Sequence, residues 1–349
     1  MSPSKRSPST ITMREVADRA GVSLMTVSYA LREDPRIPAA TREKVKNAAK
    51  ALGYKVNPLV SALMAQRRSG KTEESGSNLA VLLPGRKISG NNLEGHLPGA
   101  RARAEDRGYG LDLFYMEEEG DSGKHLTRVL RARNIHGVLI PHLNQQTQLE
   151  GDWRFFSVVA HGYTLLEPHF HRVVSDLYHG ALLALERLTG LGYRRIGLLM
   201  SEATSRNTHH LWRAAYLMHQ ASLPARQRLP EILLNLEHWQ TPLQKWNDRH
   251  QPEVILHNFP RLRPFLEEQG LQVPEDVALA YLDMKVSPGP ELSGVAGIDQ
   301  RWEAVGEAMV DVLIAKMHAN ERGIPDMPRT VLVPPKWVDG PTAPKRRDG

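Results

Sequence analysis

Residues 12–32, TMREVADRAGVSLMTVSYALR, constrain the fold of this chain more than any other segment. A helical segment over residues 13–20 is broken by Gly21, and a second helical segment follows over residues 23–31. A short helix, a glycine-containing turn and a second capped helix form a helix-turn-helix, the common unit for placing a helix in the major groove of DNA. The run therefore predicts a DNA-reading head.

The neighbouring residues complete a three-helix unit over residues 12–54. Thr12 and Glu15 have the spacing of a capping box, and Ser23 is a suitable N-cap for the second helix. The third helix, TREKVKNAAKALG, carries its apolar residues on one face: Val45, Ala48, Ala49 and Leu52.

Positive charge is concentrated in this part of the chain. Residues 1–71 contain fourteen Lys/Arg and five Asp/Glu, a net charge of +9. The remaining residues contain 31 Lys/Arg and 34 Asp/Glu, a net charge of −3. A basic head on a mildly acidic body predicts nucleic-acid binding that is confined to the head.

Composition excludes several classes of protein. The sequence has no cysteine, so it has no disulfide, thiolate metal site or cysteine nucleophile. Residues 1–9 lack the apolar segment of a signal peptide, and no apolar run approaches the ~18 residues of a membrane span. We expect a cytoplasmic protein with no membrane partner.

A short helix and a linker are predicted after the three-helix unit. Asn57 is a good N-cap and Pro58 suits the first helical position. The resulting helix, residues 57–65, is shorter than the ~12–15 residues that an isolated helix needs in water. Residues 66–78, QRRSGKTEESGSN, form a polar, Gly/Ser-rich linker.

From residue 79 onward, short apolar strands alternate with amphipathic helices. The candidate strands are 79–83, 111–115, 137–141, 155–160, 172–176, 195–200, 253–258 and 277–283, and the candidate helices are 96–107, 123–133, 178–190, 206–220, 261–269 and 301–320. This alternation predicts parallel sheets covered on both faces, and the number of strands favours two lobes with a cleft between them. The chain is therefore predicted to be multidomain: an all-α helix-turn-helix head over residues 10–56, a hinge helix and linker over 57–78, and a two-lobed α/β body over 79–340.

The sequence resembles the LacI/GalR family of bacterial transcription regulators over nearly its full length. The strongest match is EVADRAGVSLMTVSYAL followed by TREKVKNAAKALGYKVNPLVSAL, and weaker matches include HGALLALERLTGLGYRRIGLL and GLQVPEDVALAYLD. The resemblance implies a periplasmic-binding-protein-like effector core and a homodimer. It implies double-stranded operator DNA as partner and a small-molecule effector, a sugar or related metabolite, bound between the lobes. It favours a repressor.

By this resemblance, Leu24, Met25 and Tyr29 face the base edges. Leucine and methionine contact thymine methyl groups but form no bidentate hydrogen bonds, so direct readout is predicted to be weak. The alternative for Leu24 and Met25 is packing inside the head. Four short or basic side chains suit contacts with phosphate oxygens: Thr26, Ser28, Thr41 and Arg42. Tyr54 matches a tyrosine that contacts the DNA backbone in the family.

The hinge residues Asn57 and Leu63 complete the expected DNA-binding set. In the family, a leucine at the spacing of Leu63 wedges into the central minor-groove step and kinks the duplex. The alternative is that Leu63 packs against the body. The wedge predicts that Leu63→Ala weakens operator binding with little loss of thermal stability.

The cleft departs from the sugar-binding members of the family. The expected aspartate after the fourth strand aligns with His161, the expected arginine of the helix 206–220 aligns with Trp212, and the closest equivalent of a second aspartate is Asn258. An aromatic residue at the cleft hinge is retained as Trp302. These four residues predict a pocket for a sugar face or another flat, uncharged effector. The alternative is that the two tryptophans are ordinary core or interlobe residues.

Two other functions are alternatives to a ligand-controlled regulator. An enzyme is not expected, because the sequence has no GxSxG, Walker A or GxGxxG motif and no carboxylate pair with metal spacing. No cofactor and no metal are predicted, and His169, His171, His209 and His210 are interpreted as surface residues. A DNA-bending regulator without an effector stays open, because the cleft residues depart from the family.

Overall fold

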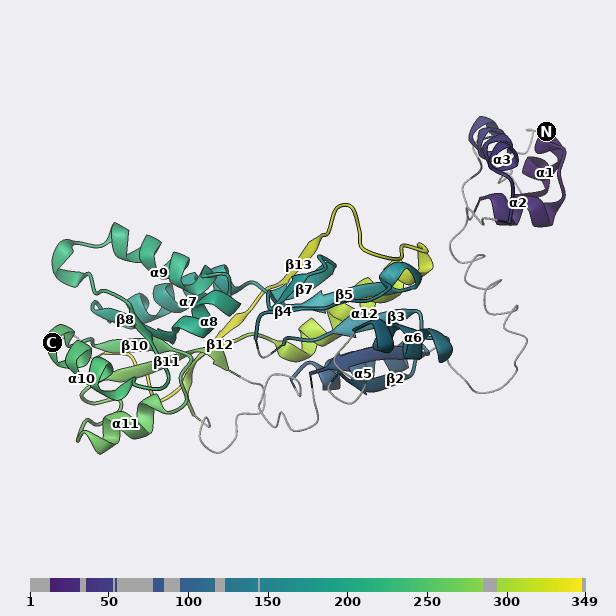
Figure 1. Ribbon diagram of the computed structural model, residues 1–349. Coiled ribbons are helices and arrows are strands. Elements are labelled where there is room, and N and C mark those ends of the chain that lie inside the picture. Colours follow the sequence, from purple (N-terminus) through teal and green to yellow (C-terminus); the bar gives the residue numbers. More distant parts are fainter. Residues whose placement is uncertain are drawn as a thin grey trace, which may run out of the picture. The chain divides into compact units, whose positions relative to one another are not determined.

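The computed structural model describes residues 13–31, 36–52, 54, 78–84, 95–116, 123–143, 145–284 and 294–346. The chain divides into two compact units, Met1–Thr72 and Glu73–Gly349, which contain the predicted head and body (Figure 1). The predicted boundaries within these units stay a prediction. Thr12, Asn57 and Leu63 lie outside the described residues, so their expected roles stay predictions too.

The described part of the head is the predicted three-helix unit. Its helices are α1 (Met13–Ala20), α2 (Leu24–Ala30) and α3 (Ala39–Leu52). Ser23 is the N-cap of α2, because its side-chain oxygen accepts a hydrogen bond from the Thr26 N–H at 3.1 Å. Gly21 has a φ of +61°, which a residue without Cβ adopts at no steric cost, so the turn begins there. The helices enclose a small core: Val16, Ala17, Ala20, Val27, Ala30, Val45, Ala48 and Ala49.

The first lobe of the body is built on a six-stranded parallel sheet in the order β13-β7-β5-β3-β1-β2. Its strands are β1 (Leu79–Leu83), β2 (Leu111–Tyr115), β3 (Gly137–Ile140), β5 (Ser157–His161), β7 (His171–Ser175) and β13 (Thr330–Val333). Its helices are α5 (Leu97–Asp106), α6 (Gly123–Ala132) and α12 (Trp302–His318). Every residue of β1 is buried, because separate apolar clusters cover the two faces of the sheet.

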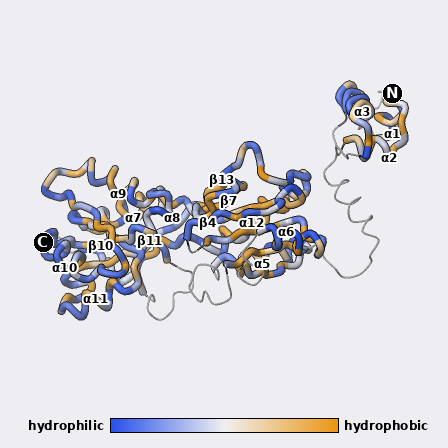
Figure 2. The backbone as a smooth tube through the Cα atoms, in the orientation of Figure 1, coloured by the Kyte–Doolittle hydropathy of each residue, from blue (hydrophilic) through white to orange (hydrophobic). Residues whose placement is uncertain are grey.

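The second lobe has a six-stranded sheet in the order β14-β12-β11-β10-β8-β9, in which only β14 is antiparallel. Its strands are β8 (Ile196–Ser201), β9 (Ile232–Leu234), β10 (Val254–His257), β11 (Ala278–Met284), β12 (Ala296–Asp299) and β14 (Lys336–Val338). Its helices are α7 (Leu177–Gly190), α8 (Glu202–Asn207), α9 (Leu211–Ser222), α10 (Gln240–His250) and α11 (Leu262–Glu268). Figure 2 shows hydrophobic and hydrophilic stretches interspersed along these helices, as amphipathic packing against a sheet requires.

The chain passes between the lobes at three places. It leaves the first lobe from β7 into α7, returns from β12 into α12, and leaves again from β13 into β14 (Figure 1). A short two-stranded sheet, β4 (Thr147–Gln148) with β6 (Leu165–Glu167), completes the first lobe. The predicted two-lobed α/β body is confirmed.

The structure corrects one predicted helix and adds elements that were missed. The segment 206–220 is broken between α8 and α9, because His209 and His210 both take left-handed backbone angles, with φ of 49° and 59°. The missed helix α10 buries only Leu243 and Trp246, too few apolar positions to show a clear period. Among the described residues, none of the helices is long and apolar enough to cross a membrane.

Candidate functional site

The recognition helix α2 presents apolar side chains to solvent. Leu24 is 51% exposed and Met25 is 66% exposed, so the alternative that they pack inside the head is wrong. Tyr29, one turn after Met25, is half-buried on the same helix. These three residues stay the predicted base-reading set.

Several of the predicted phosphate ligands also have structural contacts. The Thr26 hydroxyl lies 2.9 Å from the Ser23 hydroxyl at the helix cap, and Arg42 donates from Nη1 to the Ile37 carbonyl at 3.0 Å. Tyr54 packs against the head core, and burial raises its pKa. Ser28 and Thr41 are half-buried. Their contacts with phosphate stay predictions.

All four residues predicted to bind an effector line one cavity of about 280 Å³ between the two lobes: His161, Trp212, Asn258 and Trp302. His161 ends β5 of the first lobe, and Trp302 opens α12. Trp212 lies in the first turn of α9, and Asn258 directly follows β10 of the second lobe. The carboxyl ends of parallel strands thus converge on this cavity, the usual place for a ligand in an α/β fold.

Three polar atoms of cavity-lining residues are buried without a hydrogen-bond partner in the protein. They are His161 Nδ1, Trp212 Nε1 and Gln300 Oε1. The indole N–H is only a donor and the amide oxygen is only an acceptor, whereas an imidazole nitrogen is either, depending on its tautomer. Burying such groups unpaired costs free energy, so their position at a cavity marks a place for a polar ligand.

The histidines of the described cavity wall are neutral near pH 7. Burial lowers the pKa of His142 to about 4, and burial together with His96 and His142 holds the pKa of His161 well below its usual range. Asp283 is the only acidic residue among the described residues that line the cavity, and its Oδ1 accepts a hydrogen bond from Trp302 Nε1 at 2.9 Å. The described lining residues include no lysine or arginine.

Sequence reasoning missed a cluster of rings behind the cavity. His96 lies 3.3 Å from His161, measured between their Nε2 atoms, and its ring packs edge-on against Trp302 at 4.3 Å. Sequence reasoning also missed Asp283 and Gln300. Asp283 lies near the carboxyl end of β11, where a ligand usually binds in an α/β fold, so the strand pattern could have indicated it. No sequence pattern indicated His96.

Other residues that the sequence pattern singled out lie outside the cavity. Arg213, one residue out of register with the expected arginine, pairs with Glu231 at 2.8 Å. His171 is buried and bonds to Glu321 Oε1 at 2.5 Å, so its interpretation as a surface residue is wrong. No group of three residues suited to a metal ion is found in the described ranges.

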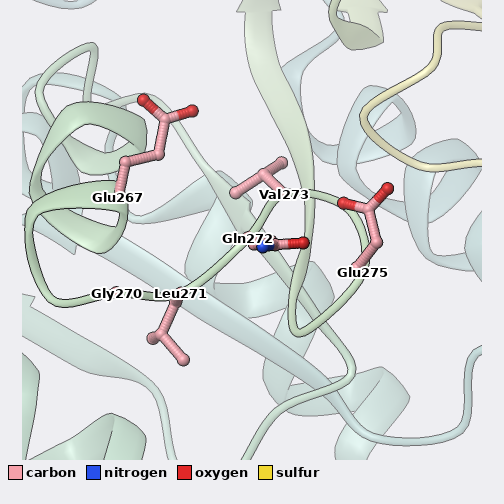
Figure 3. Close-up of a pocket in the computed structure, with 6 residues that line it drawn as sticks. All are labelled: Glu267, Gly270, Leu271, Gln272, Val273 and Glu275. Atoms are coloured by element: carbon pink, nitrogen blue, oxygen red, sulfur yellow. The ribbon is translucent and has the colours of Figure 1, made fainter.

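A second hollow, of about 430 Å³, lies on the surface of the second lobe. Figure 3 shows Glu267, Leu271 and Glu275 pointing in different directions around it. Because its side chains do not converge on a common point and it is open to solvent, it is a surface depression and not a built site.

Comparisons with known proteins match both parts of the chain. The family model described as bacterial regulatory proteins, lacI family, matches residues 12–57, and that described as periplasmic binding protein-like domain matches residues 185–342. Residues 12–57 are thus similar to the head of lacI-family regulators, and residues 185–342 are similar to a periplasmic-binding-protein-like core. With this helix-turn-helix head on this core, the chain is a DNA-binding transcription regulator.

Full-length relatives agree with this assignment. The regulator is 24% identical over 328 residues to the HTH-type transcriptional repressor PurR of Aliivibrio salmonicida, covering 88% of this chain and 92% of that protein. It is 24% identical over 314 residues to the lactose operon repressor of Escherichia coli, covering 87% and 84%. The structure of the Lac repressor bound to ONPG matches with a TM-score of 0.57 and 20% identity, covering 95% of this chain and 99% of that chain. The transcriptional regulator CelR–cellobiose complex matches with a TM-score of 0.53 and 18% identity, covering 95% and 99%.

Proposed function

We propose that this regulator is a cytoplasmic homodimeric repressor whose operator affinity is set by a small neutral molecule in the interlobe cavity. The observation that carries the proposal is the set of unpartnered buried polar atoms at that cavity: His161 Nδ1, Trp212 Nε1 and Gln300 Oε1. A polar ligand in the cavity would supply the hydrogen bonds that the protein does not provide to these atoms. The body is proposed to act by binding, not as an enzyme.

The chemistry of the wall selects the class of effector. An anionic ligand would lose its hydration without gaining a cation, because the described wall has no lysine or arginine and carries Asp283. A ligand with hydroxyl groups suits the wall, because each hydroxyl both donates and accepts hydrogen bonds. The flat indole faces of Trp212 and Trp302 suit the apolar face of a sugar ring. A volume of about 280 Å³ is near the lower end of the ~300–1,000 Å³ typical of ligand sites, which favours a monosaccharide.

Contacts across the cleft provide the coupling. Asp283 of the second lobe accepts from the indole of Trp302, which opens a helix of the first lobe. Tyr163 of the first lobe stacks on His209 of the second lobe with 4.4 Å between ring centroids. A ligand that binds one relative arrangement of the lobes more tightly shifts the population toward that arrangement. The changed spacing between the two heads of a dimer would then change operator affinity.

The test is a thermal-shift screen of the full chain against matched neutral and charged compounds. D-ribose, D-xylose and D-galactose serve as neutral probes, and their phosphate esters and uronic acids serve as anionic ones. We expect stabilisation by a neutral probe and none by its anionic partner. Stabilisation by the anionic partners alone would contradict the proposed effector class.

A matched pair of variants assigns any stabilisation to the cavity. Trp212→Phe removes the indole donor from the wall, whereas Trp337→Phe changes a tryptophan of β14 that does not line the cavity. The first substitution is expected to weaken the response to the neutral probe, and the second to leave it unchanged. Equal responses in both variants would place the binding elsewhere.

A further inference from the structure

The recognition helix lacks the groups that usually read bases. Its sequence, LMTVSYA, contains no basic residue and no amide side chain. The commonest specific contact with DNA is an arginine or lysine hydrogen-bonded to the O6 and N7 atoms of guanine. Leu24 and Met25 have no such capacity, and the Tyr29 hydroxyl is a single donor and acceptor. A reading face built from α2 alone would therefore have little power to recognise guanine.

A guanidinium from outside α2 lies on this face. The Arg36 side chain is exposed, and its Cζ atom lies 4.7 Å from the centroid of the Tyr29 ring. Tyr29 comes four residues after Met25, so both side chains project from the same side of α2. Stacking on an aromatic ring uses the face of the guanidinium and not the N–H edge that forms bidentate hydrogen bonds.

The backbone beside Arg36 is anchored to the head. Ile37 packs against the head core, and its carbonyl accepts a hydrogen bond from Arg42 Nη1 at 3.0 Å. The next carbonyl, of Pro38, accepts from the N–H groups of Thr41 and Arg42 at the start of α3. Arg36 therefore extends from a fixed point, which lowers the entropic cost of holding its side chain in a contact.

We propose that Arg36, supported on the ring of Tyr29, reads a guanine in each operator half-site. The guanidinium fork would donate to guanine O6 and N7, and the tyrosine ring would hold its plane. The proposed contact lies beside the thymine-favouring contacts predicted for Leu24 and Met25. Phosphate oxygens offer the same pair of acceptors, so the experiment must separate a base from a phosphate.

The experiment selects bound DNA from a random pool with the full-length wild type, and then measures affinities for the selected operator and its single-base variants. We expect the wild type to require a guanine at symmetric positions, and replacing that guanine in one half-site to weaken binding about 5- to 150-fold. Arg36→Ala is expected to remove this discrimination. Arg36→Lys keeps the charge but not the fork, so it is expected to lose most of the discrimination as well.

Two tyrosine variants test the support. Tyr29→Phe keeps the ring and is expected to retain the guanine preference, whereas Tyr29→Ala is expected to reduce it. Thermal midpoints of the Arg36 variants should equal that of the wild type, because the side chain is exposed.

The outcomes separate this inference from the function of the chain. If Arg36→Ala weakens binding to all sequences equally and lowers the salt slope by about one, Arg36 binds phosphate and the proposal is wrong. Wild-type affinity and preference in Arg36→Ala would also overturn it. A wild type that selects no sequence at all would instead contradict the sequence-specific function itself.

Discussion

The recognition helix of the head exposes apolar side chains at its tip, whereas the interlobe cavity of the body encloses polar ones. Met25 at the tip of the recognition helix is 66% exposed, while Gln300 at the interlobe cavity is 1% exposed. Residues 1–71 contain no histidine and no tryptophan, and the rest of the chain contains all fifteen histidines and all six tryptophans. The head, with a net charge of +9 over residues 1–71, suits the charged surface of DNA. The body suits a small ligand that forms hydrogen bonds with its buried polar atoms. The two regions should respond to different perturbations.

The largest effect is expected from Gly306 in α12. A Cβ built there would lie 2.1 Å from the backbone oxygen of His96, so Gly306→Val should force apart α5 and α12. We expect a loss of at least about 3 kcal/mol in the free energy of unfolding of the body. Tryptophan fluorescence during urea unfolding measures it, because every tryptophan lies in the body.

Gly190→Ala in α7 is the control for Gly306→Val, because a Cβ at Gly190 would meet nothing within 4 Å. It should leave the midpoint unchanged or raise it slightly, since alanine restricts the unfolded chain. The comparison between head and body would be weakened if Gly306→Val also melted the head helices in the same transition.

The next largest effect is a loss of stability of the body at acidic pH. Burial lowers the pKa of His257 to about 3, whereas the unfolded value is about 6.5. Between these values the unfolded state binds more protons, so stability falls as pH falls from about 6.5 towards 3. One such histidine makes folding about 2 kcal/mol less favourable at pH 5 than at pH 7.

His257→Phe is expected to remove that part of the pH dependence. Its own cost cancels, because the difference between pH 7 and pH 5 is compared within each variant by urea unfolding. Trp337→Phe, which changes no titratable group, gives the control and should leave the difference unchanged. An unchanged difference in His257→Phe would show that the pKa of this histidine is the same in the folded and the unfolded protein.

A smaller effect is expected from Trp212→Phe at the cavity. The indole Nε1 is buried without a protein partner, so its removal should weaken binding of a stabilising neutral sugar by about tenfold. Calorimetric titration measures the change. Operator affinity without ligand should be unaffected, and a loss of that affinity would mean that Trp212 supports the fold and not the ligand.

The smallest effect is expected at the exposed tip of the head. Met25→Ala should weaken operator binding by about 1 kcal/mol through lost contact with a thymine methyl group. Stability should change by less than about 0.5 kcal/mol, because the side chain is largely exposed. Uracil lacks the methyl group of thymine. If the wild type prefers thymine to uracil and Met25→Ala does not, Met25 contacts the thymine methyl group.

The fold was largely predictable because its strongest elements are locally encoded. The predicted ranges of β1 and β2 match the structure, since each is a short apolar run between turn residues. The break at His209 and His210 was not predictable, because two non-glycine residues in left-handed geometry depend on tertiary contacts such as the stacking of Tyr163 on His209, with 4.4 Å between ring centroids. Strand β14 was missed for the same reason, because its pairing with β12 joins distant segments.

The candidate site was predictable only in part. His161, Trp212, Asn258 and Trp302 follow from their positions in the family pattern, and the structure brings them to one cavity. His96 and Arg36 were missed, because neither has a local pattern: the His96 ring packs against Trp302, and the Arg36 guanidinium lies over the Tyr29 ring. Such contacts appear only when the chain is folded.

The most direct test of the account is operator affinity with and without a saturating cavity ligand. The operator selected from a random pool is titrated against the full chain, alone and with the neutral sugar that stabilises it. We predict a change in the operator dissociation constant of about 5- to 150-fold, the typical range of coupling between two sites, and its loss in Trp212→Phe at the same sugar concentration. An unchanged operator affinity at full occupancy of the cavity would contradict a ligand-controlled regulator.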